Sequence, residues 1–315
     1  MQNIAFLFPG QGSQRPGMGK DLVARHPELA DRYYRPADDI LGFGLSRLCW
    51  EGTAEDLVPT EITQPAVFLT SVAVLHVLHG HGITPSVVAG HSLGEYAALV
   101  AAGVLDWRDA LRLVRRRGEL MAQVNERTPG AMAAVIGPAA EQVERICAEV
   151  AGRTGAVVEV ANYNDPAQHV VSGERDAVRE VVAVARALGA ERTVALGVGA
   201  PFHCRLMAAV EEEFGAELDR VEFREPRVPV LSAVTAGPVR DGAEARRVLR
   251  RQLAGAVRWA DTLRAIAASG TDTFVEAGPG RALSGFVRAT LPGAVCHPAG
   301  QARRIDRLVA APAAA

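Results

Sequence analysis

Ser92 stands at the centre of a Gly-x-Ser-x-Gly motif, between Gly90 and Gly94, and this spacing can present a serine hydroxyl as a nucleophile. A short β-branched stretch precedes the motif and an alanine-rich stretch follows it. This context favours a sharp strand-to-helix turn over a chance occurrence in a loop, because the two glycines let neighbouring backbone pass close to the serine. The N-terminus of the following helix would supply amide groups where an oxyanion forms.

A serine hydroxyl is a weak nucleophile at neutral pH, so it needs a base within hydrogen-bond distance. His91 is the immediate neighbour of Ser92, and neighbouring side chains on a turn point apart. His203 follows an apolar, glycine-containing stretch much later in the chain. Taken alone, such a histidine is more often packed in a core, but together with Ser92 it becomes the best candidate for the general base.

The composition limits the class of protein. The chain has 315 residues, 49% of them hydrophobic and 22% charged, which is enough for one large core or a core plus a subdomain. A net charge of −2 argues against nucleic acid as the partner. The four cysteines form no Cys-x-x-Cys motif, so we expect neither a metal site nor a disulfide framework. Without a signal peptide or an apolar run of about 18 residues, we expect a cytoplasmic protein that does not bind membranes.

Alternating strand and helix patterns must position Ser92 and His203. The patterns predict a strand, a helix, the elbow strand and a basic-faced helix at residues 3–8, 63–79, 86–89 and 109–124. Residues 129–197 then read as strand, helix, strand, strand, helix, strand, which is the ferredoxin-like order. We therefore predict an α/β fold: an α/β-hydrolase-like catalytic domain with a parallel sheet (1–128 and 198–315) that carries an inserted ferredoxin-like subdomain (129–197). The tail from about Gln301 is expected to fray.

Several motifs together resemble one family. The resemblance runs from about residue 3 to about residue 290, and its motifs occur in the family's order. They are Phe6–Gln14, Thr63–Ala66, Gly90–Glu95, Arg117–Met121, Gly130–Val135, Ala161–Asn164, Pro201–Cys204, Val257–Trp259 and Val275–Gly280. On these residues the chain resembles the malonyl-CoA:acyl-carrier-protein transacylases and the acyltransferase domains of fatty-acid and polyketide synthases.

The resemblance implies a ping-pong mechanism. Ser92 would attack the thioester carbonyl of an acyl-CoA, and His203 would take the serine proton and return it to the departing thiolate. The phosphopantetheine thiol of an acidic acyl carrier protein would then attack the acyl-serine. In the family a backbone carbonyl orients the histidine, and we expect it from residues 230–235, where relatives commonly have Asn in place of Ala233. No bound cofactor and no metal are implied.

The resemblance also implies roles around the nucleophile. Gln11 and the amide of Leu93 would form the oxyanion hole, where the loss of one donor costs roughly 10²–10³ in rate. His91 and Asn162 would lie beside the substrate. Gln64 either helps to order this region or is simply a polar residue early in a helix.

Arg117 is implied to select the acyl group. In relatives the arginine at this position holds the free carboxylate of malonyl or methylmalonyl, for which a guanidinium fork is well suited. The alternative is a solvated basic face shared with Arg115 and Arg116. Phe202 narrows the space beside the substrate and favours malonyl, whereas Gly199, where many relatives have Ser, would enlarge the pocket floor.

These features lead to one expected function and two alternatives. We expect an acyltransferase that moves malonyl from CoA to a carrier protein, with a trans-acting polyketide role favoured over fatty-acid synthesis. The alternatives are transfer of an unusual acyl or aminoacyl group, and an editing thioesterase in which water replaces the second thiol. Three basic regions are either solvated faces or guides for the carrier protein: Arg246–Arg251, Arg303–Arg307 and Arg153.

Overall fold

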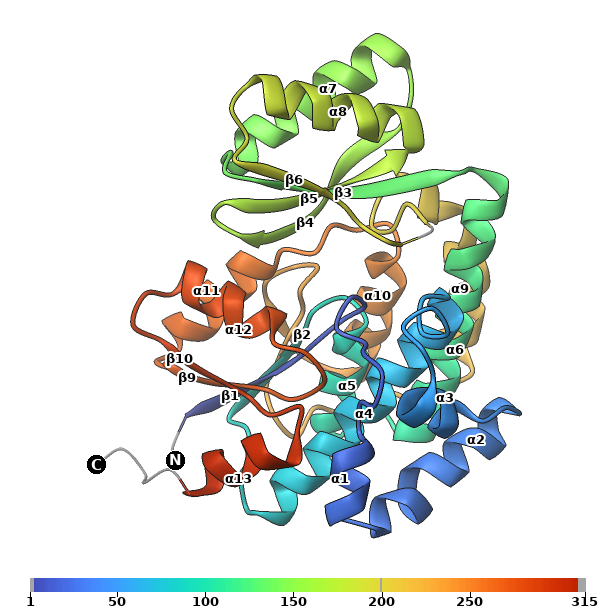
Figure 1. Cartoon of the computed structure of the whole chain (residues 1–315), viewed down its shortest axis with the longest axis vertical. Helices are drawn as coiled ribbons and strands as arrows, with labels where there is room; N and C mark the ends of the chain where they lie inside the picture. Colours follow the sequence, from blue (N-terminus) through green and yellow to red (C-terminus); the bar gives the residue numbers. More distant parts are fainter. Residues whose placement is uncertain (1–2, 199, 311–315) are drawn as a thin grey trace.

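The larger of two sheets forms the body of the molecule (Figure 1). The computed structural model describes residues 3–198 and 200–310. Within them, this sheet has six strands in the order β10-β9-β1-β2-β7-β8, and its neighbours pair in parallel except for the antiparallel pair β7–β8. The strands are β1 (Ile4–Phe8), β2 (Val87–Gly90), β7 (Val230–Leu231), β8 (Pro238–Val239), β9 (Thr273–Glu276) and β10 (Val295–Pro298). The predicted parallel sheet is confirmed.

Helices cover both faces of this sheet, because side chains along a strand alternate between its faces. Phe6 and Phe8 face one core, which includes α4 and α6, whereas Ala5 and Leu7 face a second core with α11 and α12. The helical segments of the body are α1 (Lys20–Arg25), η1 (Ala30–Tyr34), α2 (Arg35–Leu41), α3 (Leu45–Glu51), α4 (Thr60–Gly80), α5 (Gly94–Ala101), α6 (Trp107–Arg127), η2 (Arg205–Val210), α9 (Glu211–Asp219), α10 (Gly242–Gln252), α11 (Trp259–Ala268), α12 (Ala282–Thr290) and α13 (Ala302–Ala310).

Helix α4 corrects the expectation that the chain has no apolar run of about 18 residues. An 18-residue window of this helix has a mean hydropathy of 1.4, so by length and composition it is able to cross a membrane. In the fold, 83% of that window is buried. The apolar composition of α4 is therefore that of a helix at the centre of the body, packed against α6.

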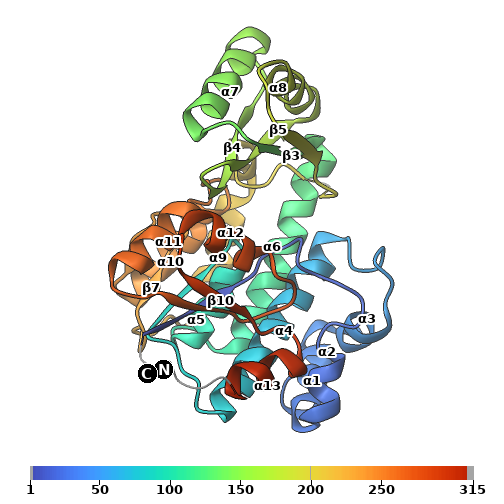
Figure 2. The same cartoon turned by 60° about the vertical axis from the view of Figure 1, so that its left-hand side comes forward.

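The smaller sheet stands at one end of the molecule, with its two helices on the side away from the body (Figures 1 and 2). Counted over the described residues, it has four antiparallel strands in the order β4-β5-β3-β6. Its elements are β3 (Gly130–Ile136), α7 (Ala140–Thr154), β4 (Val158–Asp165), β5 (Gln168–Glu174), α8 (Arg175–Ala187) and β6 (Arg192–Ala195). This is the predicted β-α-β-β-α-β order, with an apolar core of its own between sheet and helices.

Strand β4 joins this subdomain to the body. Val257, in the loop between α10 and α11, donates its N–H to Ala161 and accepts a hydrogen bond from the N–H of Tyr163, at 2.8 and 2.9 Å. The body loop thus runs beside β4 as a short parallel bridge. This contact fixes the subdomain edge against the segment that follows α10.

The C-terminal segment contradicts the expected fraying as far as residue 310. Helix α13 buries Ala302, Ile305 and Leu308 on one face. The N–H of Ala302 donates to the carboxylate of Asp21 at 2.8 Å, which caps the helix against the N-terminal part of the chain. Its apolar residues recur at helical spacing, so this tail packs on the body; residues 311–315 lie outside the described residues.

Candidate active site

Ser92 occupies a sharp turn between β2 and α5. Its φ angle is 53°, a left-handed conformation that is uncommon for a residue with a side chain. A Cβ on Gly90 would lie 2.0 Å from the main-chain carbon of Gly94, and a Cβ on Gly94 would lie 2.0 Å from the main-chain oxygen of Phe8. Both glycines are therefore required sterically, and the strained serine is held by the strand and helix on either side.

Replacing Gly94 with alanine is expected to destabilise the protein by about 3 kcal/mol or more, because the new methyl group would overlap the backbone of β1. Urea unfolding of the purified variant measures this change. Gly152→Ala is the matched control, since Gly152 lies in α7 with open space around it and helix propensity favours alanine there by about 1 kcal/mol. Equal stabilities of the two variants would contradict this account of the turn.

His203 is the partner of the serine. Its Nε2 lies 2.6 Å from Ser92 Oγ, and its Nδ1 lies 3.0 Å and 3.1 Å from the main-chain oxygens of Gln252 and Gly255. Since carbonyl oxygens only accept hydrogen bonds, Nδ1 must carry the proton and Nε2 is left with a free lone pair. The ring is thereby held in the tautomer that can take the serine proton.

The source of these carbonyls corrects the sequence-based expectation, which placed the histidine's partner in residues 230–235. The carbonyl of Ala233 instead accepts a hydrogen bond from the N–H of Arg258 at 2.6 Å. The end of α10 and the loop after it face His203, whereas the turn after β7 supports that loop from behind.

The environment of His203 keeps its ring neutral. The side chain is only 4% exposed, and burial, followed by the positive charge of Arg117, lowers its pKa from 6.5 to about 3. Because a lowered pKa favours the deprotonated ring, the form that acts as a base persists at every pH well above 3.

We therefore expect no downward step near pH 6.5 when the rate of Ser92 acylation is followed from pH 8 to pH 5. Acetyl-CoA is the suitable donor, because an acetyl group has no carboxylate that titrates or pairs with Arg117. Rapid-quench measurement of acyl-enzyme formation gives this profile. A fall of tenfold per pH unit below 6.5 would mean that the ring is solvated and protonates normally.

The two residues expected to form the oxyanion hole flank the serine from different segments. Leu93 lies between Ser92 and the start of α5, and Gln11 lies in the glycine-rich loop after β1. Among the described residues, the N–H groups of Gln11 and Leu93 donate to no main-chain acceptor. Uncommitted amides beside the nucleophile are what an oxyanion hole requires.

Arg117 reaches the nucleophile from helix α6. Its side chain is 1% exposed, and Nη2 donates to Ser92 Oγ at 3.2 Å and to the side-chain oxygen of Gln252 at 3.0 Å, while Nη1 donates to the side-chain oxygen of Gln64 at 2.8 Å. Gln64 is buried behind the guanidinium, so it contacts Arg117 rather than the cleft. The side-chain nitrogen of Gln64 also donates to the side-chain oxygen of Gln11 at 3.4 Å.

Arg115 and Arg116, which precede Arg117 in α6, make surface ion pairs and do not reach Ser92. Arg115 and Arg116 pair with Glu119 of the next helical turn at 2.7 and 3.3 Å, and Arg116 also pairs with Glu213. Their side chains remain about a third exposed. The basic-face interpretation therefore describes these two residues, and Arg117 alone of the three points to Ser92.

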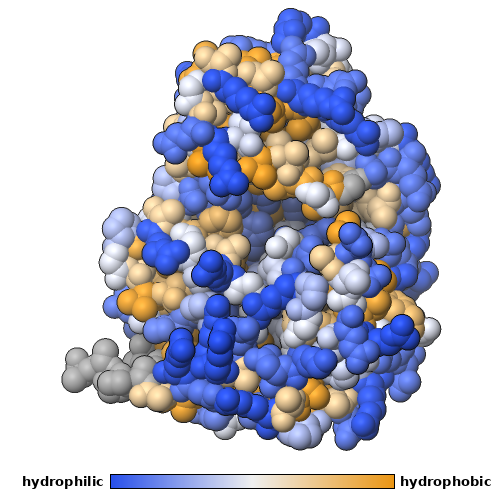
Figure 3. Space-filling view, viewed as in Figure 1, coloured by the Kyte–Doolittle hydropathy of each residue, from blue (hydrophilic) through white to orange (hydrophobic). Residues whose placement is uncertain are grey.

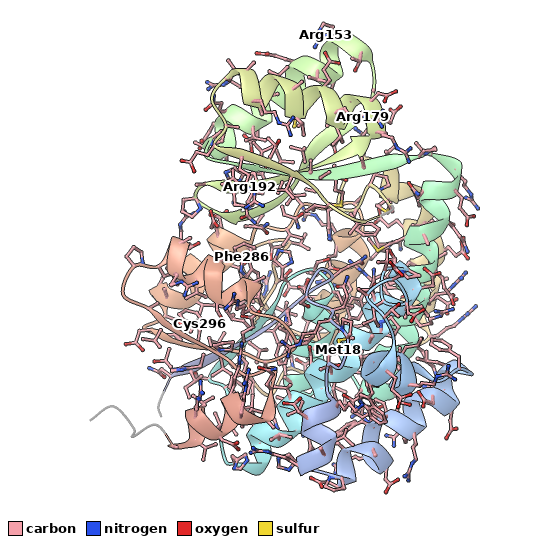
Figure 4. All side chains as sticks on the ribbon, viewed as in Figure 1. Met18, Arg153, Arg179, Arg192, Phe286 and Cys296 are labelled. Carbon is pink, nitrogen blue, oxygen red and sulfur yellow. The ribbon has the colours of Figure 1, made fainter. Side chains whose placement is uncertain are left out.

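A cleft of about 280 Å³ opens at Ser92 between the two sheets. The space-filling view shows the surface hollowed between the two parts of the fold (Figure 3), and Figure 4 places Phe286 on the body and Arg192 on the subdomain. The lining comes from both parts of the fold and includes Gln11, His91, Ser92, Met132, Asn162, Val170, Leu196, Phe202, His203 and Phe286.

The remaining expected substrate contacts fall into two groups. Asn162 and Phe202 line the cleft, 6% and 5% exposed respectively. His91 also lines it, but its Nε2 lies 2.8 Å from the side-chain oxygen of Asn164 on β4, so this ring ties the elbow to the subdomain. Burial lowers the pKa of His91, which keeps it neutral in this contact. Gly199 lies outside the described residues.

Sequence reasoning missed two buried residues of this site. The side chain of Gln252, at the end of an arginine-rich helix, bridges Arg117, the main chain of Ser92 and Glu95. Glu95 belongs to the elbow motif, but the motif assigns no role to its buried carboxyl. The only available signal was the presence of a charged residue inside an otherwise apolar helix start.

Comparison with known proteins agrees with this geometry. A family model described as "Acyl transferase domain" matches residues 5–310. The malonyl CoA-acyl carrier protein transacylase of Bacillus subtilis (strain 168) is 43% identical over 288 residues, covering 91% of this chain and 90% of that protein. The enzyme of the same name from Escherichia coli (strain K12) is 40% identical over 289 residues, covering 91% and 93%.

A solved structure has the same fold over nearly the whole chain. In a complex described as a type II PKS acyl-carrier protein with its malonyl-transacylase, the matching chain is 37% identical with a TM-score of 0.94, covering 98% of this chain and 99% of that one. The agreement extends over both sheets and the cleft between them. On the family match, the sequence relatives and the shared fold, this chain belongs to the acyl transferase domain family.

Proposed function

We propose that this protein transfers a malonyl group from CoA to the phosphopantetheine thiol of an acyl carrier protein, through an ester on Ser92. The observation that carries this proposal is the position of Arg117. Its guanidinium is 1% exposed and lies 3.2 Å from the nucleophilic oxygen, with neutral oxygens of Gln64 and Gln252 as its other close partners. A buried cation beside the nucleophile favours an acyl group that brings its own carboxylate.

The first half-reaction forms the acyl-enzyme. Ser92 Oγ attacks the thioester carbonyl carbon while its proton moves to Nε2 of His203, and the carbonyl oxygen becomes an oxyanion facing the amides of Gln11 and Leu93. When the C–S bond breaks, the CoA thiolate takes the proton back from His203. Nδ1 keeps its own proton, which it donates to the carbonyl oxygens of Gln252 and Gly255. The negative ends of these carbonyl dipoles face the ring and stabilise the imidazolium.

The second half-reaction reverses these roles. The neutral Nε2 of His203 takes the proton of the carrier protein's thiol, and the sulfur attacks the ester carbonyl of malonyl-Ser92. The C–O bond to Ser92 breaks, and the serine oxygen recovers its proton from His203. The reaction exchanges one thioester for another, so it needs no bound cofactor and no metal.

Phe202 supports malonyl over methylmalonyl as the transferred group. Its ring lines the cleft next to His203 and is 5% exposed, so it limits the room at the α-carbon of a bound acyl group. A methyl branch at that carbon would have to displace the ring, at a cost typical of overpacking.

The partner proteins of the relatives support the choice of acceptor. Both transacylases are named for acyl carrier proteins, and the solved malonyl-transacylase is bound to a type II PKS carrier protein. We extend this to an acidic carrier protein of a polyketide pathway acting with this chain in the cytoplasm. The four free cysteines support a reducing compartment.

The basic regions that we considered as guides for this partner are partly paired within the chain. Arg246 and Arg250 lie 3.8 and 3.6 Å from Asp219 and Glu211. Arg153 pairs with Glu180 and lies at the outer end of the subdomain (Figure 4). These contacts weaken Arg153 as a guide, because an acidic partner would have to replace an existing ion pair far from the cleft.

Intact-protein mass spectrometry tests the proposal. The protein is mixed separately with malonyl-, methylmalonyl- and acetyl-CoA, and a malonyl adduct is expected to form fastest. On addition of a holo carrier protein the adduct should disappear and the carrier should gain its mass. An adduct that is lost to water in the absence of carrier would identify an editing thioesterase, and no adduct from any donor would point to an unusual acyl group.

A further inference from the structure

Gln252 forms hydrogen bonds with four residues of the site: His203, Arg117, Ser92 and Glu95. Its main-chain oxygen accepts from Nδ1 of His203 at 3.0 Å. Its side-chain oxygen accepts from Nη2 of Arg117 at 3.0 Å, and its side-chain nitrogen donates to the main-chain oxygen of Ser92 at 3.0 Å. The same nitrogen donates to the carboxyl of Glu95. The residue is fully buried and is not among the residues that line the cleft.

These partners determine how the amide of Gln252 is oriented. Arg117 has only donors and therefore needs the amide oxygen, whereas the carbonyl of Ser92 and the carboxyl of Glu95 need its N–H groups. A flipped amide would place N–H groups against the guanidinium and its oxygen against two acceptors. The amide therefore has one favourable orientation, in which the nitrogen donates to two acceptors and the oxygen accepts from Arg117.

The guanidinium of Arg117 is held from two sides by neutral amides. Gln64 on α4 binds Nη1 and Gln252 on α10 binds Nη2, so the Nη2 atom stays within 3.2 Å of Ser92 Oγ. The carboxyl of Glu95 lies on the other side of the Gln252 amide, and among the described residues it forms no ion pair with Arg117. Burial raises the pKa of Glu95 to about 7, so this carboxyl is only partly ionised at neutral pH. Arg117 is thus fixed in place and still free of a carboxylate.

We propose that the side chain of Gln252 is a positioning residue for acyl selection: it holds Arg117 at the nucleophile so that a malonyl carboxylate finds the guanidinium already in place. This inference rests on the proposed function. An acetyl group has no use for Arg117, so the side chain of Gln252 should matter less for acetyl transfer. The main-chain carbonyl that orients His203 does not depend on the side chain.

The test is Gln252→Met, which keeps the length of the side chain and removes both of its hydrogen-bonding atoms. Acylation of Ser92 is measured by rapid quench with malonyl-CoA and with acetyl-CoA. We expect the ratio of malonyl to acetyl kcat/KM to fall roughly tenfold to a hundredfold, the effect of one lost hydrogen bond to a charged group, with most of the change in the KM for malonyl-CoA. A purely structural role would lower both rates together and leave the ratio unchanged.

A double-mutant cycle with Arg117→Ala tests the route of the effect. If Gln252 acts through Arg117, Gln252→Met should not change the ratio further once Arg117 is absent. Gln142→Met is the matched control: this side chain lies on α7 of the subdomain, away from the site, and the ratio should equal that of the unmodified protein. If the methionine variant does not fold, Gln252→Asn replaces it, since an amide shorter by one methylene cannot span Arg117 and Glu95.

The outcomes separate this inference from the function on which it rests. An unchanged ratio in Gln252→Met, or an equal fall of the ratio in the presence and absence of Arg117, overturns the positioning role. If the unmodified protein forms no malonyl adduct at all, the proposed function fails before Gln252 is tested.

Discussion

Ser92→Ala should abolish the acyl-enzyme and lower malonyl transfer by on the order of 10⁴-fold or more, because the nucleophile of the first half-reaction is removed. The effect should be as large for acetyl-CoA as for malonyl-CoA, since both use the same oxygen. Intact mass after mixing with each donor measures adduct formation, and transfer to a holo carrier protein measures turnover.

Ser86, the residue just before β2, provides the control. Ser86 donates its hydroxyl hydrogen bond to the main chain of Ile4 at 3.1 Å and lies at the far end of β2 from the elbow. Ser86→Ala should therefore retain the adduct. A malonyl adduct that persists on Ser92→Ala would show that another residue carries the acyl group.

Arg117→Ala should convert the enzyme from a malonyl-selective to a non-selective transferase. Two charge-assisted hydrogen bonds to the malonyl carboxylate, each worth about 1.5–3 kcal/mol, would be lost, so malonyl kcat/KM should fall by roughly 10²–10⁴. Acetyl transfer should be retained or improved, because a neutral acyl group no longer has to share the cleft with a buried charge. Steady-state transfer of both acyl groups to the same carrier protein measures the two changes.

Arg116→Ala is the matched control for this prediction. Arg116 is the preceding residue of α6, but it pairs with Glu119 and Glu213 at the surface and does not approach Ser92. The variant should change both rates less than threefold, as expected for a solvent-screened ion pair. Equal losses of malonyl and acetyl transfer in Arg117→Ala would assign Arg117 a structural role instead of substrate selection.

Local patterns in the sequence were sufficient for the elbow and the overall fold. Only glycine fits at positions 90 and 94, since any side chain there would overlap neighbouring backbone. The alternation of strand and helix patterns likewise predicted a parallel sheet and the order of the inserted subdomain, because burial imposes periods that are visible in the residues themselves. The need of Ser92 for a base already made His203 the best candidate, and the resemblance to a family of acyltransferases supported this pairing.

Contacts made by main-chain atoms left no such signal. The carbonyls that orient His203 belong to Gln252 and Gly255, and our expectation that they come from residues 230–235 was wrong. Every residue has a carbonyl, so residue type gives no information on which one faces the ring. The packing of α10 and of the loop after it against His203 determines which carbonyls face the ring.

The sequence by itself determined the nucleophile, the order of the elements and the presence of a basic helix near the site, because each depends on local residue types and spacing. The resemblance singled out Arg117 among the three neighbouring arginines. The tertiary structure alone decided its contact with Ser92 and the placement of Gln252 and Glu95 behind it. These assignments depend on contacts between α4, α5, α6 and α10, which are distant in the chain. The type of a residue such as glutamine or glutamate in a helix does not indicate which distant residue it will contact after folding.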